Sequence, residues 1–129
     1  MTHSLEFRDG VLRARTSGDI EIYGFLEYLR AVLEHEKWTP GGKLLCDHRE
    51  LKGFSMNIPN VTHKTGQVAN FIKDNEARLG NAAIASILPC MDASPVTSLW
   101  ITFIEHIKVD INYKNFYDMV HAEQWLSSR

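Results

Sequence analysis

The chain has 129 residues, of which 44% are apolar and 23% charged, and its formal net charge is −2. This length fits one domain, residues 1–129, with a hydrophobic core, and the mixing of basic with acidic residues argues against nucleic acid as a partner. No apolar run reaches the ~18 residues of a transmembrane helix, and the first residues lack a signal-peptide pattern, so we expect a cytoplasmic location.

The first predicted element is a β-hairpin. Residues 5–8 and 11–16 alternate between apolar and polar, and Asp9-Gly10 between them suits a tight turn with positive φ. The side chains expected to face the core are Leu5, Phe7, Leu12 and Ala14. Ser17-Gly18-Asp19 is expected to end the second strand.

The spacing of the apolar residues changes after the hairpin. Apolar residues recur at three- and four-residue steps over 20–37, which predicts an amphipathic helix. The adjacent apolar residues of 43–47 predict a strand covered on both faces, as in a parallel sheet. A loop over 48–57 and a second helix over 59–79, closed by Gly80, come next.

The last third of the chain repeats the alternation of strand and helix. A buried strand is predicted over 82–88, and Ser94-Pro95 begins a helix whose apolar stripe includes Trp100 and Phe103. An edge strand over 109–113 precedes a final helix, which Asp118 caps and whose apolar positions are Met119, Ala122, Trp125 and Leu126. Alternating strands and helices imply parallel crossovers, with strands 43–47 and 82–88 as parallel neighbours at the centre of the sheet.

Candidate chemistry gathers at the carboxyl ends of these strands, where open α/β sheets bind ligands. Asp47 and His48 follow one strand, Cys90 and Asp92 follow the next, and Asn115 lies in the turn after the last. Asp47 and His48 are adjacent, so they point to opposite faces of a shared strand, which argues against an acid/base pair. Cys90 is the best nucleophile candidate, because a helix N-terminus nearby would lower its pKa. No Cys-x-x-Cys or close His pair is present, so no metal site is expected.

The order of elements resembles the SpoIIAA-like group of STAS domains, named after sulphate transporters and anti-sigma-factor antagonists. Four features carry the resemblance: the opening hairpin, the segment Leu44–Asp47 with Leu51, Gly53 and Phe54 after it, the buried strand over 82–88, and the closing Ala122–Leu126. The resemblance implies a SpoIIAA-like α/β fold with a mixed, mostly parallel sheet of four to five strands, an N-terminal hairpin and about four helices.

The resemblance also implies a regulatory role. In anti-sigma-factor antagonists a serine after the central strand is phosphorylated, but here the corresponding stretch is Phe54–Ile58. Asn57 stands close to the serine position, and Ser55 is out of register with it. We therefore expect a binding module without that phosphorylation switch.

In this interpretation the chain is not an enzyme, needs no cofactor, and binds a small ligand or a protein, which includes a second copy of itself. The candidate ligand- or partner-binding residues are Asp47, His48, Phe54, Ser55, Asn57, Cys90 and Asp92. Two alternatives stay open. One is a Sec14-like carrier or sensor of an apolar or anionic small molecule, and the other is a small enzyme that uses Asp47, His48 or Cys90.

Overall fold

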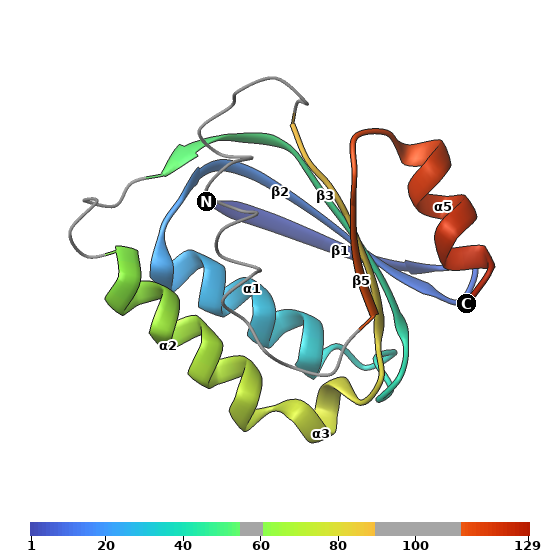
Figure 1. The fold of residues 1–129 in the computed structure, drawn as a ribbon, viewed down its shortest axis with the longest axis horizontal. Helices are drawn as coiled ribbons and strands as arrows, with labels where there is room; N and C mark the ends of the chain where they lie inside the picture. The colour runs from blue at the N-terminus through green and yellow to red at the C-terminus, as the bar shows by residue number, and fades with distance from the viewer. Residues whose placement is uncertain (55–60, 90–111) are drawn as a thin grey trace.

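The computed structural model describes residues 1–54, 61–89 and 112–129. The described residues form an α/β arrangement with one five-stranded mixed sheet and four helices (Figure 1). The strands are β1 (Thr2–Arg8), β2 (Val11–Ile20), β3 (Lys43–Phe54), β4 (Ala83–Ile87) and β5 (Asn112–Phe116). The helices are α1 (Ile22–Glu34), α2 (Val61–Asp74), α3 (Glu76–Leu79) and α5 (Met119–Ser127). The predicted α/β class with an N-terminal hairpin is confirmed.

The strands lie in the sheet in the order in which they occur along the chain, β1-β2-β3-β4-β5. β1 runs antiparallel to β2, and each later strand is parallel to the one before it. β3 and β4 are therefore parallel neighbours away from both edges, as predicted. All five residues of β4 are buried, which explains why its sequence carries no polar alternation.

The opening hairpin forms around the predicted turn. Asp9 and Gly10 have φ values of 55° and 75°, and Arg8 pairs directly with Val11 across them. Phe7, expected in the core, is instead 42% exposed. That expectation was wrong because β1 is the edge strand of the sheet, where little covers the end nearest the turn.

Two strands are longer than predicted. The segment Ser17–Asp19 does not end β2, because Gly18 takes a φ of 84° and the strand continues past two register shifts to Ile20. Residues 48–54 of the loop predicted over 48–57 are strand instead, since β3 extends to Phe54 by pairing with this added length of β2, and residues 55–57 lie outside the described residues. The extra strand length was invisible in the sequence because neither half alternates regularly.

The first two predicted helices also differ in extent from their predictions. α1 ends at Glu34 rather than at residue 37, and the Trp38 indole N–H beyond it donates to the Arg78 carbonyl oxygen at 2.9 Å. The single helix predicted over 59–79 is divided into α2 and α3. At the break, the side-chain amide of Asn75 donates to the Phe71 carbonyl oxygen at 2.8 Å.

Helices lie on both faces of the sheet (Figure 1). α1, α2 and α3 lie on one face, where Phe25, Tyr28 and Val32 of α1 join a buried cluster with β2, β3 and β4. α5 lies on the other face, and its Ala122 and Leu126 pack on the opposite side of β3 and β4. Asp118 caps α5 as predicted, because its Oδ1 accepts from the His121 backbone N–H at 2.9 Å.

The last strand is shifted relative to its prediction. β5 lies at the edge, as expected, but it spans Asn112–Phe116, and Asn115 lies within it opposite Ser86 rather than in a turn. Residues 109–111 lie outside the described residues, and so does the predicted helix with Trp100 and Phe103.

Candidate functional site

The alternation of β3 separates its two central polar residues. Asp47 points to the α5 side of the sheet, where it meets arginines of β2 and β3, whereas His48 points to the α1 side. Both residues are almost fully buried, at 7% and 1% exposure. The predicted separation of this pair is confirmed, so the two do not form an acid/base couple with each other.

His48 is buried within the layer between the sheet and α1. Its Nδ1 lies 2.7 Å from the Thr16 hydroxyl, and its ring packs edge-on against Tyr28 with 6.1 Å between the ring centroids. Burial opposes a positive charge on the imidazole and lowers the pKa of His48 to about 4, against the weaker pull of Asp47. The ring is therefore neutral at physiological pH.

A second buried contact lies on the same side of the sheet. The Tyr28 hydroxyl donates to the Cys46 sulfur at 2.8 Å. Burial raises the pKa of the Cys46 thiol to about 12, although Tyr28 and Ser86 beside it favour the thiolate. Burial likewise raises the pKa of Tyr28 well above its ordinary value. Both groups are neutral, so Cys46 is a free thiol of the core rather than a nucleophile.

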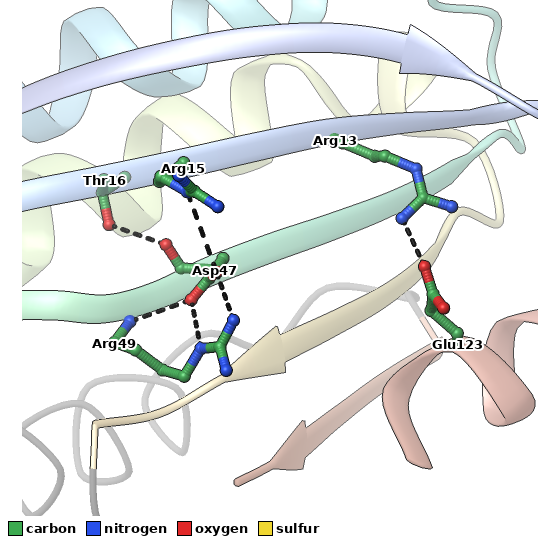
Figure 2. A network of polar contacts seen from close by, with 6 residues as sticks. All are labelled: Arg13, Arg15, Thr16, Asp47, Arg49 and Glu123. Carbon is green, nitrogen blue, oxygen red and sulfur yellow. Dashed lines mark hydrogen bonds and ion pairs between the residues drawn. The ribbon is translucent and has the colours of Figure 1, made fainter. Parts of the chain in front are cut away.

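Asp47 is held on the other face by the arginine two residues beyond it. The Arg49 guanidinium donates to both carboxylate oxygens of Asp47, at 2.9 and 2.8 Å, and the Arg49 backbone N–H donates at 3.1 Å (Figure 2). The Arg15 Nε lies 3.9 Å from the same carboxylate. Burial opposes the charge on Asp47, but the hydrogen bonds from Arg49 and the charge of both arginines outweigh it and lower its pKa.

A second ion pair continues this polar surface toward α5. Arg13 of β2 donates to Glu123 of α5, which joins residues 110 positions apart in the chain (Figure 2). We call the five residues Arg13, Arg15, Asp47, Arg49 and Glu123 the charged face. α5 packs on β3, β4 and β5, and it also reaches β2 near Val11 and Arg13.

The charged face presents guanidinium groups to solvent. The Arg15 and Arg49 side chains are 62% and 42% exposed, although the Asp47 carboxylate between them is only 10% exposed. A guanidinium fork held in place by a buried carboxylate is suited to bind an anionic group such as a carboxylate or phosphate. This arrangement of donors is suited to binding an anionic group.

The structure places only part of the predicted site. Asp47 and His48 are described, but on opposite faces. Phe54 ends β3 with its side chain outside the described residues, and the candidates Ser55, Asn57, Cys90 and Asp92 all lie outside them.

Sequence reasoning missed the two exposed arginines of the charged face. Asp47 and Arg49 are two residues apart in a strand, a spacing that puts both on one face, so their pairing was available as a signal. Arg15 gave no such signal, because only the parallel register of β2 with β3 brings it opposite Asp47.

Over the described ranges, no helix combines the length and apolar content needed to cross a bilayer, and no three potential metal ligands gather together. The chain was compared with protein-family models and with curated proteins, and neither comparison finds a match.

Proposed function

We propose that this chain is a non-catalytic STAS-like module that binds an anionic group of a protein partner through the charged face. The observation that carries the proposal is the pairing of two exposed guanidinium groups, Arg15 and Arg49, with one buried carboxylate, Asp47. The sheet supports the STAS-like part, since an N-terminal hairpin in a mixed, mostly parallel sheet is the arrangement that the resemblance implies.

The geometry of Arg49 favours binding over a purely structural role. Asp47 takes up its Nε and one Nη, which fixes the plane of the guanidinium and lowers the entropy lost when a ligand binds. Within the described part of the chain, Arg15 contacts the carboxylate through Nε alone, so both of its Nη groups stay available as donors. Arginine is enriched among the central residues that contribute most of the binding energy at protein interfaces.

The proposed module is regulatory but lacks the phosphorylated serine of the anti-sigma-factor antagonists. Asn57 stands near that position, so partner binding would be controlled by the partner rather than by phosphate on this chain.

Quantitative affinity capture from a lysate of the source organism tests the proposal. The wild type is compared with Arg15→Gln/Arg49→Gln and with the control Arg30→Gln, which changes an exposed arginine on α1. We expect a specific protein that the wild type and the control capture equally and the double variant loses at least tenfold. Capture that is unaffected by the double variant would place the binding surface elsewhere and refute the proposal.

A carrier or sensor of a small molecule is the second candidate. It is favoured by the polar side chains that lie in the otherwise apolar layer beneath α1: Thr16, Tyr28, His48 and Ser86. Native mass spectrometry of the purified protein distinguishes the two, because a carrier would retain a co-purified molecule of fixed mass.

A further inference from the structure

The outer edge of β1 is a regular, exposed strand edge. β1 has seven residues that pair with β2 without a bulge, and six of them are exposed. No strand lies on its other side in the described sheet. Natural edge strands are usually protected by short length, charged side chains, a proline or a bulge, and β1 has the charged Glu6 and Arg8 but no proline or bulge. The exposed Phe7 ring lies on this edge strand.

The hairpin turn determines which backbone groups of β1 point outward. In a hairpin with a two-residue turn, the flanking pair, here Arg8 and Val11, exchanges both of its hydrogen bonds. Because this pattern alternates along a strand, His3, Leu5 and Phe7 direct their backbone N–H and C=O groups away from β2. These three residues are the ones able to accept another strand.

We propose that this edge pairs with the same edge of a second copy of the chain, antiparallel and centred on Leu5. In this register Leu5 lies opposite Leu5 of the second copy, and each His3 lies opposite a Phe7. The three outward-pointing pairs then exchange about six backbone hydrogen bonds. The two sheets join into one, and Phe7 gains an aromatic neighbour.

Charge disfavours one of the neighbouring registers. A shift of the pairing by one residue on each strand would put Glu6 opposite Glu6 of the second copy, and like charges directly opposed are unfavourable. Centred on Leu5, Glu6 instead lies opposite Ser4 of the second copy, which pairs with Arg15 on its own β2. Two strand spacings, about 10 Å, separate Arg15 from that Glu6. Both side chains are long enough to meet across the small Ser4, so Arg15 gains a second carboxylate besides Asp47, and Glu6 gains a second guanidinium besides Arg8.

Sedimentation velocity over a concentration series tests this assembly. Phe7→Pro removes an outward N–H without taking a hydrogen bond from β2, so a folded monomer is expected, with folding checked by circular dichroism. Glu6→Arg and Arg15→Glu should each weaken the dimer about tenfold through the two symmetric pairs. The double variant Glu6→Arg/Arg15→Glu restores opposite charges and should recover most of that loss.

The outcomes separate this inference from the proposed function. A wild type that stays monomeric, or a dimer in which the double charge reversal is no stronger than either single variant, would overturn the assembly. Neither result would change the expected capture of a protein partner by Arg49. Loss of capture in a monomeric Phe7→Pro variant would show that the partner needs the dimer and would support the assembly.

Discussion

Protonation of His48 should make the stability of the fold depend on pH. The folded-state pKa of about 4 lies below the ordinary value of 6.5, so between these values the unfolded chain binds more protons than the folded one. The contribution of the neutral ring is fully present above pH 6.5 and is lost as the pH falls toward the folded pKa. Multiplying the shift by 1.36 kcal/mol per unit gives a total of about 3 kcal/mol, of which about 2 kcal/mol falls between pH 7 and pH 5.

Urea unfolding followed by tryptophan fluorescence measures this effect, since the chain has three tryptophans. The free energy of unfolding of the wild type should fall by about 2 kcal/mol from pH 7 to pH 5, with an unchanged m-value. His48→Gln should be less stable at pH 7 but largely lack this fall. The exposed His3 provides the matched control, and His3→Gln should keep it.

Two results would refute the reasoning. One is a wild type whose stability is flat over this range, and the other is a His48→Gln variant with the same slope as the wild type. The Asp47 carboxylate does not confuse the test. Its pKa is lowered from 3.8, so its contribution is present above pH 3.8 and is lost only below the window that is measured.

Three further outcomes are expected. Gly80→Ala should lower the free energy of unfolding by well over the ~1 kcal/mol expected for Gly10→Ala. Both glycines have positive φ, but a Cβ at Gly80 would lie 2.7 Å from a backbone nitrogen, whereas nothing lies within 4 Å of one at Gly10. Equal losses of stability in urea unfolding would contradict this close approach of the backbone at Gly80. In a Cys90→Ser variant, Cys46 should resist a thiol reagent at pH 8 until urea is added, and rapid labelling of the native protein would show that the thiol is accessible. Incubation with lysate and ATP should leave residues 55–60 unphosphorylated, and stoichiometric phosphate on Ser55 that alters partner binding would restore the anti-sigma-antagonist interpretation.

Local signals in the sequence predicted most of the elements. Asp9-Gly10 favours a tight turn through its local backbone preference, independently of the rest of the fold. The apolar run of β4 is uninterrupted because neither face of this strand is exposed to solvent. The lengths of β2 and β3 were not predictable in this way. Their last residues are held by pairing with each other across irregular register, a contact between distant segments that no local pattern encodes.

The candidate site was predictable to a smaller degree. The opposite orientation of Asp47 and His48 followed from strand geometry. The buried Tyr28 was missed, and only the fold brings Cys46 to its hydroxyl as an acceptor. Arg15 was missed for a similar reason, since its importance comes from the neighbour that the sheet supplies rather than from its own sequence context.

The position of α5 has a consequence for synthesis on the ribosome. Strands β1 to β4 and the helices on the α1 side can assemble as soon as they emerge, because each parallel strand joins the one made just before it. Among the described elements, the opposite face of β3 and β4, with Leu45, Ala85 and Ile87, is covered by α5, the last one to be made. Until α5 emerges, this apolar sheet surface lacks that cover, and transiently exposed apolar surface of this kind is what chaperones bind.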